Sequence, residues 1–250
     1  MSGATFVLVH GAFRAGWAFD RLLPELAARG HQGVALDLPD PREVPVDLDV
    51  YGHAIARELE ERDLRDVWLV GHSQGGIVIR AASQYCADRL RGLIHLDAPV
   101  ALHGERPFDL VPEAMLAQRP PEPAADTLFD PWPARASEHL SEADAAWMNE
   151  RLRPEAAAVA LSRLRWDSPA ALALPRRYLF CRQTPDTFPC AHGRARLLSE
   201  GVPFDWLDAP HDVAWTHPAA LAEALETIAH SPLLPDEQAL RKPATTVREP

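Results

Sequence analysis

The chain has 250 residues, of which 47% are hydrophobic and 24% charged, a composition that is ordinary for a soluble globular protein. Its formal net charge of −11 disfavours phosphate backbones and anionic membranes, so we expect neither a nucleic acid nor a membrane as a partner. No apolar run reaches the ~18 residues of a membrane-spanning helix and no basic leader begins the chain, which predicts a cytoplasmic protein.

Short apolar segments alternate with amphipathic ones from the N-terminus onward. Strands are predicted at residues 5–9, 33–36, 67–70, 93–96, 177–181 and 204–207. Helices are predicted at residues 17–29, 50–62, 77–87, about 190–200 and 217–230, where apolar residues recur at helical spacing. Short buried strands that alternate with helices predict an α/β fold, with a mostly parallel sheet covered by helices on both faces.

This rhythm stops between residues 101 and 170, which are rich in Pro, Ala and Glu. Helical pieces are predicted near residues 112–118, 141–152 and 154–165, and no segment reads convincingly as a strand. We therefore expect a helical cap at 101–170, inserted into a core formed by residues 1–100 and 171–230. Residues 231–250 lack periodicity and are expected to form a mobile tail.

The cysteines, Cys86, Cys181 and Cys190, are odd in number and show no CxxC spacing. This pattern favours buried free thiols over a disulfide framework or a zinc site. Lys242 is the only lysine of the chain, which removes lysine chemistry from the core. We expect neither a metal nor a cofactor.

A candidate nucleophile lies between the third predicted strand and the following helix. Residues 71–75 read Gly-His-Ser-Gln-Gly and match the G-x-S-x-G nucleophile elbow in the required strand–turn–helix context. The glycines permit a tight turn that presents the hydroxyl of Ser73, while the N-terminus of the helix offers N–H groups to a developing oxyanion.

A serine hydroxyl needs a base within hydrogen-bond reach, and His211 is the best candidate among the 11 histidines. It lies after the last predicted strand and before the last helix, so it should reach the same edge of the sheet as Ser73. His72 is constrained by the elbow, and His217 is expected to cap a helix or face solvent. His10 belongs to the loop after the first strand, which brings the N–H of Ala12 near the oxyanion.

The acid partner of His211 has two candidates. Asp186 follows the 177–181 strand and fits the chain order Ser, Asp, His, so we take it as the predicted acid. Asp97 ends the 93–96 strand and is the alternative, since a carboxylate on a neighbouring strand end could also reach the histidine.

These motifs together resemble the α/β-hydrolase superfamily, and within it the small-ester hydrolases grouped with plant methylesterases and hydroxynitrile lyases. The resemblance covers roughly residues 5–230. It implies an α/β-hydrolase fold, with the N–H groups of Ala12 and Gln74 as oxyanion donors. This family usually carries its acid where the present chain has Thr184.

The resemblance also implies a substrate pocket beneath the cap, roofed around Trp132. We expect His10, Phe13, His72 and Val213 to line it. Trp147 and Trp166 are also in the cap, where they either contact the substrate or pack the cap itself.

The predicted function is that of a cofactor-independent serine carboxylesterase, which acts on a small, mostly apolar or aromatic ester through an acyl-enzyme. The alternative is a non-hydrolytic lyase or cyclase of secondary metabolism that uses the same Ser/His site for proton transfer. A non-catalytic receptor on this fold is a third possible function.

The lysine with which the related hydroxynitrile lyases hold cyanide is replaced here by Asp212, which argues against cyanohydrin cleavage. The expected partner is a small-molecule substrate, and a homodimer is left open.

Overall fold

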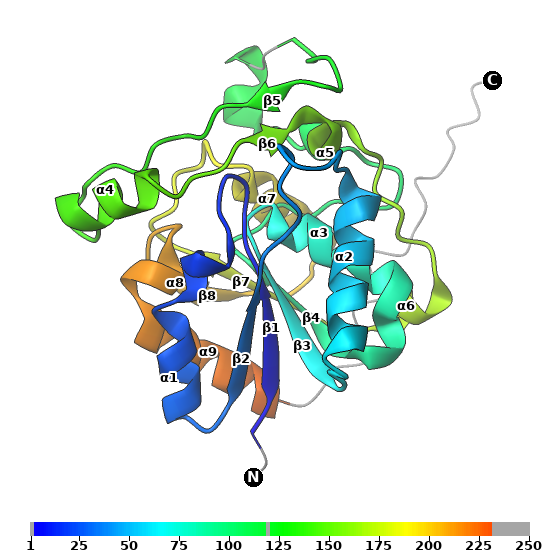
Figure 1. The fold of residues 1–250 in the computed structure, drawn as a ribbon, viewed down its shortest axis with the longest axis vertical. Helices are drawn as coiled ribbons and strands as arrows, with labels where there is room; N and C mark the ends of the chain where they lie inside the picture. Colours follow the sequence, from blue (N-terminus) through cyan, green and yellow to red (C-terminus); the bar gives the residue numbers. More distant parts are fainter. Residues whose placement is uncertain (1–2, 119–120, 232–250) are drawn as a thin grey trace.

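A parallel sheet organises the computed structural model, which describes residues 3–118 and 121–231. Within these residues, six strands lie in the order β2-β1-β3-β4-β7-β8, and every neighbouring pair is parallel (Figure 1). The strands are β1 (Thr5–Val9), β2 (Gln32–Leu36), β3 (Val67–His72), β4 (Leu90–Leu96), β7 (Arg176–Cys181) and β8 (Asp205–Leu207). Each predicted strand is present, with ends shifted by a few residues.

Helices cover both faces of this sheet because alternate strand residues point to opposite sides. Phe6 and Leu8 of β1 pack in one apolar cluster with α1 (Leu22–Ala28) and α9 (Pro218–His230), whereas Val7 and Val9 pack in another with α2 (Leu48–Glu61) and α3 (Gly75–Cys86). A third cluster holds α7 (Cys190–Glu200) against β7. The strands are therefore apolar on both faces, as their near-continuous hydrophobic runs predict.

The predicted helix at 17–29 is divided in two. A 3₁₀ turn at Gly16–Phe19 precedes α1, and a short helix α8 (Val213–Thr216) precedes α9. A further 3₁₀ turn, Ala87–Arg89, follows α3.

The segment expected to be a cap lies over the end of the sheet to which the strands point (Figure 1). It contains 3₁₀ turns at Pro107–Asp109 and Glu113–Gln118, and the helices α4 (Glu142–Asn149) and α5 (Ala157–Leu161), with α6 (Pro169–Ala173) after it. It also contains two short strands, β5 (Leu128–Phe129) and β6 (Glu155–Ala156), paired antiparallel. The prediction of a strand-free cap was wrong, since pairing with β5 overrides the helical tendency of the alanine-rich stretch that begins at Glu155.

Aromatic packing attaches α4 to the core. Trp147 of α4 lies edge-on to Trp17, with ring centroids 5.4 Å apart, and stacks on Trp215 at 4.9 Å. Trp166 is buried between the guanidinium groups of Arg80 and Arg176, 4.4 and 5.2 Å from its ring. Both tryptophans therefore pack the cap against the core.

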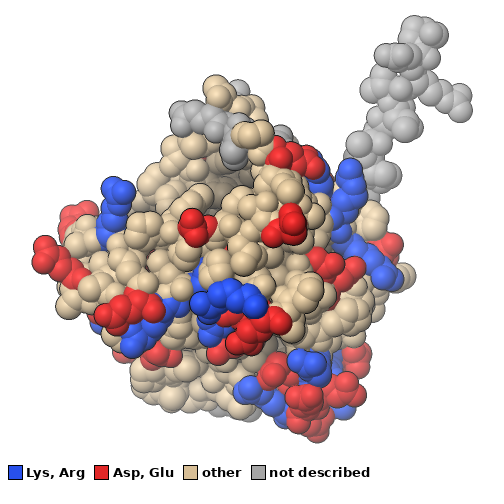
Figure 2. Space-filling view, turned by 45° about the horizontal axis from the view of Figure 1, so that its top comes forward, with Lys and Arg blue, Asp and Glu red and all other residues tan. Residues whose placement is uncertain are grey.

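In the described part of the chain, no helix is both long and apolar enough to span a membrane. On the face shown in Figure 2, acidic and basic side chains are interspersed and do not separate into regions of one sign. The predicted mobile tail lies outside the described residues, apart from Ser231.

Two leucines test the assignment of the helical faces. Leu225 of α9 is fully buried in the cluster beneath the sheet, whereas Leu198 of α7 is 68% exposed. We expect Leu225→Ala to lower the free energy of unfolding by about 2–5 kcal/mol, because it removes buried apolar surface and leaves a cavity. Leu198→Ala should change it by less than about 0.5 kcal/mol. Chemical denaturation of both variants measures the difference, and equal losses would contradict the assignment.

Candidate active site

Ser73 occupies a strained turn between β3 and α3. Its φ angle is +53°, a left-handed conformation that non-glycine residues rarely adopt. A side chain at Gly71 would collide with the backbone of Gly75, which explains the glycine at that position. The N–H of Ser73 donates to the carbonyl of Leu96 at 3.0 Å, so the end of the neighbouring strand fixes the turn. This geometry is that of a nucleophile elbow.

Two backbone N–H groups beside Ser73 are free to bind an anion. The N–H groups of Ala12 and Gln74 donate to no other group of the described residues. Gln74 precedes the first residue of α3, where the positive end of the helix dipole favours negative charge. A Cβ at Gly11 would lie 2.9 Å from Cβ of Ser73, so the loop that carries Ala12 approaches the serine closely. Both predicted oxyanion donors are therefore next to the elbow.

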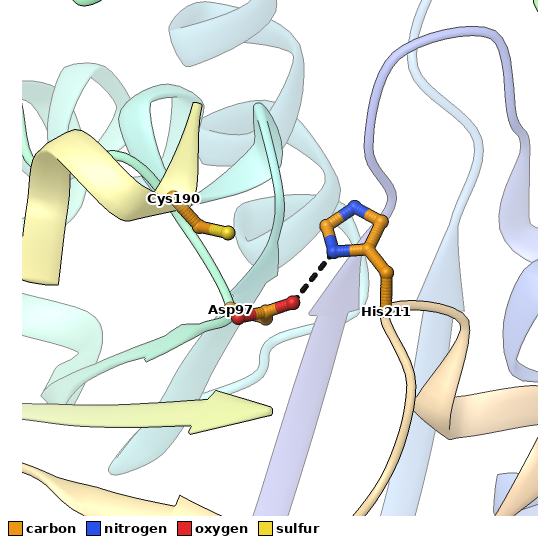
Figure 3. Close-up of side chains that lie close together, drawn as sticks. All are labelled: Asp97, Cys190 and His211. Atoms are coloured by element: carbon orange, nitrogen blue, oxygen red, sulfur yellow. Dashed lines mark hydrogen bonds and ion pairs between the residues drawn. The ribbon is translucent and has the colours of Figure 1, made fainter. Parts of the chain in front are cut away.

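His211 lies on the loop between β8 and α8. Its Nδ1 is 2.6 Å from Oδ2 of Asp97, and Figure 3 shows this contact with the second ring nitrogen on the far side of the imidazole. Nε2 of His72 donates to the backbone carbonyl of His211 at 2.9 Å, which ties the histidine loop to the elbow. Because Nδ1 is occupied by the carboxylate, Nε2 is the nitrogen left to act as a base.

Asp97 follows β4 and is completely buried. Its Oδ1 accepts from the N–H of Cys181 at 3.1 Å, and its Oδ2 accepts from the hydroxyl of Thr184 at 2.6 Å. Burial opposes ionisation, but the hydrogen bonds from His211, Thr184 and Cys181 outweigh it and lower the pKa of Asp97 below its usual value. The carboxylate is therefore charged at neutral pH.

The assignment of Asp186 as the partner of His211 was wrong. Asp186 pairs with Arg194 at 2.5 Å, and its side chain is 86% exposed. It follows β7 as predicted, but its carboxylate is held by the first turns of α7. Asp97, the alternative acid, is the carboxylate that contacts His211.

Cys190 lies beside this pair at the start of α7 (Figure 3). Its sulfur and one ligand atom each from Asp97 and His211 lie within 4.8 Å of one another, so a metal ion is a conceivable occupant. Ligation would require a thiolate, whereas burial raises the pKa of the Cys190 thiol. It would also displace the hydrogen bond between Asp97 and His211. The donor set therefore suits the observed hydrogen-bonded pair better than a metal centre.

His10 and Val213, which were expected to line the substrate pocket, have structural contacts in the folded core. The Nδ1 of His10 lies 2.9 Å from the carbonyl of Gly11, and its Nε2 accepts from the N–H of Leu38 at 3.2 Å. Burial lowers the pKa of His10 to about 4, so this neutral ring braces the loop after β1. Val213 has no exposed surface and packs in the core. Both side chains are buried in this structure, Val213 in an apolar core cluster, and their place in a substrate pocket stays a prediction.

The remaining pocket residues lie around the elbow. His72 borders a cavity between the core and α4, lined by Arg14, Trp17, Ala18, Phe19, His72, Met148, Asp212, Ala214 and Trp215. Burial and the neighbouring His211 lower the pKa of His72 to about 4, which keeps its ring neutral. Phe13 lies 5.7 Å from Trp132, measured between ring centroids. Trp132 is 69% exposed, so it lies beside the loop that carries Ala12 and Phe13 with most of its surface in solvent.

Three polar residues at the site were not singled out from the sequence as contributors. Thr184 orients Asp97 through its hydroxyl. The only sequence feature that pointed to Thr184 is its position, where the related hydrolases carry their acid. Arg14 pairs with Asp212 at 3.2 Å at the border of the cavity. Glu155 of β6 is only 8% exposed and lies near the loop of Phe13. No sequence pattern marked Arg14 or Glu155, since each finds its partners only through the tertiary fold.

Known proteins resemble this chain in sequence and in fold. The carbendazim hydrolyzing esterase of Nocardioides sp. is 32% identical over 178 residues, which span 62% of this chain and 70% of that protein. Salicylic acid-binding protein 2 of Nicotiana tabacum is 34% identical over 139 residues, about half the length of each (52%). An extracellular alpha/beta-hydrolase from a Paenibacillus species superposes with a TM-score of 0.71 at 23% identity, and the match covers 90% of this chain and 98% of that one.

The predicted fold class and the predicted relationship are both confirmed. A model of the alpha/beta hydrolase family matches residues 6–224, which include Ser73, Asp97 and His211. This chain belongs to the alpha/beta hydrolase family.

Proposed function

We propose that this protein is a serine carboxylesterase in which Ser73, His211 and Asp97 form the catalytic triad. The observation that carries the proposal is the 2.6 Å contact between Asp97 and Nδ1 of His211, on the loop that His72 ties to the elbow of Ser73. A buried carboxylate on Nδ1 selects the tautomer whose Nε2 accepts a proton. The esterases among the relatives support hydrolysis of an ester.

In the first half of the reaction, Oγ of Ser73 attacks the carbonyl carbon of the ester and its proton passes to Nε2 of His211. The carbonyl oxygen becomes an oxyanion, which the N–H groups of Ala12 and Gln74 stabilise. His211 then returns the proton to the leaving alcohol, and the C–O bond to that alcohol breaks. Asp97 keeps its negative charge throughout and stabilises the imidazolium.

In the second half, water attacks the carbonyl carbon of the acyl-enzyme. His211 removes a proton from the water, and the same two N–H groups hold the second oxyanion. The bond between the acyl carbon and Oγ breaks, Oγ recovers its proton from His211, and the carboxylic acid leaves. Besides the ester and one water molecule, these steps use only Ser73, His211, Asp97 and the N–H groups of Ala12 and Gln74.

The substrate of this proposal is a small, mostly apolar or aromatic ester, because apolar and aromatic side chains surround His72 and Asp212, the chain neighbours of Ser73 and His211. Trp17, Phe19, Met148 and Trp215 supply most of the apolar wall of the cavity that His72 borders, and pockets of this kind recognise ligands chiefly by apolar contact. Asp212 also borders the cavity, but Arg14 neutralises it at 3.2 Å. The surroundings of His72 therefore carry little net charge.

The role of Ser73 is tested by p-nitrophenyl esters from acetate to hexanoate. We expect the native protein to release p-nitrophenol and Ser73→Ala to lose more than about 1,000-fold in kcat, because no other group at the site replaces the nucleophile. Undiminished turnover by a folded Ser73→Ala variant would refute the proposal. Absence of turnover by the folded native protein would favour the lyase or cyclase alternative instead.

The identity of the acid is tested by a matched pair of aspartate variants. Asp97→Asn should lower kcat by about 100- to 10,000-fold, because an amide no longer selects the tautomer of His211. Asp186→Asn should change kcat by less than about threefold, since it removes only an exposed ion pair. Steady-state kinetics on one ester measure both, and a larger loss in Asp186→Asn would overturn the assignment of Asp97.

A further inference from the structure

The cap contacts the oxyanion loop through the backbone of Phe13. The N–H of Arg153 donates to the carbonyl of Phe13 at 3.1 Å, and the carboxylate of Glu155 interacts electrostatically with the N–H of Phe13. Phe13 has a φ of +66°, and a bulky residue adopts this conformation only where its surroundings impose it. The segment around β6 therefore interacts with both polar backbone groups of the residue that follows Ala12.

The same carboxylate reaches the other side of the site. Glu155 interacts electrostatically with the side chain of Gln74, the residue that carries the second oxyanion donor. It also accepts from the hydroxyl of Tyr51 and from the N–H of Ala156, each at 3.2 Å. One side chain of the cap thus joins the loop of Ala12 to the start of α3.

Placing a carboxylate here has an energetic cost. Glu155 is 8% exposed, and burial raises its pKa to about 7, although the interactions with Tyr51, Ala156, Gln74 and Phe13 oppose this rise. Docking a cap requires no buried carboxyl group, because apolar contacts such as those of Trp147 achieve it. The convergence of partners from three segments gives Glu155 a more specific role than cap packing.

We propose that Glu155 is a positioning residue, which sets from the cap the relative placement of the two oxyanion donors, the N–H groups of Ala12 and Gln74. This inference rests on the proposed esterase function. Glu155 does not touch the substrate. Glu155 lowers the free energy of the transition state more than that of the bound substrate, because negative charge develops between the two donors only in the transition state.

Ester kinetics and an oxyanion mimic together test this role. In an aryl trifluoromethyl ketone, Oγ of Ser73 adds to the carbonyl carbon and its proton passes to His211, which leaves an alkoxide between the two N–H groups. The corresponding methyl ketone fills the same space and reports binding of the uncharged ground state. The variants are Glu155→Ala and Glu155→Gln, with Glu150→Ala as control, since Glu150 is a cap residue whose side chain is 74% exposed.

We expect Glu155→Ala to lower kcat by about 10- to 100-fold, somewhat less than the loss of a whole oxyanion donor. Affinity for the trifluoromethyl ketone should fall by a similar factor, while KM and affinity for the methyl ketone change less than about threefold. Glu155→Gln keeps an acceptor oxygen and should stay within about fivefold of the native protein. Glu150→Ala should behave as the native protein.

Two results would overturn the proposal. One is a Glu155→Ala variant within twofold of the native protein in kcat and in affinity for the trifluoromethyl ketone. The other is an equal loss of affinity for both ketones, which would show that Glu155 merely docks the cap. Should Glu155→Ala fail to fold, Tyr51→Phe removes one donor to the same carboxylate, and it must weaken the trifluoromethyl ketone more than the methyl ketone. Failure of the esterase proposal itself is recognised separately, by undiminished binding of the trifluoromethyl ketone to Ser73→Ala.

Discussion

The buried carboxylate of Asp97 has no exposed surface, and a charge removed from water persists only where hydrogen-bond donors surround it. Its donors come from three places: the N–H of Cys181 at the end of β7, the hydroxyl of Thr184 just beyond it, and the ring of His211 before α8. Satisfying one charge thus brings together segments that are more than 80 residues from Asp97 in the chain. The orientation of His211 follows from this requirement.

Ser73 and Asp97 lie at the edge of the parallel sheet where strands β3 and β4 end. Backbone pairing continues one residue past the strand ends, since the N–H of Ser73 donates to Leu96 and the N–H of Asp97 donates to Leu179. Both residues also have positive φ angles, +53° and +44°, so strain is concentrated where the chain leaves the sheet. The cap completes the site from above, through contacts that reach the loop beside Ala12. The strand ends thus place Ser73 and Asp97, and the segment around β6 contacts the loop beside Ala12.

The order of strands and helices, the elbow at Ser73 and the position of His211 could be read from local patterns, because buried strands, tight turns and strand-end loops leave signals within a few residues. The choice between Asp186 and Asp97 could not, because both follow predicted strands and only the sheet order and the partners in space separate them. Asp186 meets Arg194, a contact that no spacing rule anticipates. Glu155 left no signal either, since its partners belong to segments far away in the chain.

Asp97 holds the imidazole of His211 through the proton on Nδ1. Proton NMR observes such a proton directly, as a strongly downfield resonance of a hydrogen-bonded histidine ring. This resonance should be present in the native protein and in Asp186→Asn, and absent from Asp97→Asn, because the carboxylate of Asp97, and not that of Asp186, contacts Nδ1 of His211. A resonance that survives in Asp97→Asn and disappears in Asp186→Asn would contradict this assignment.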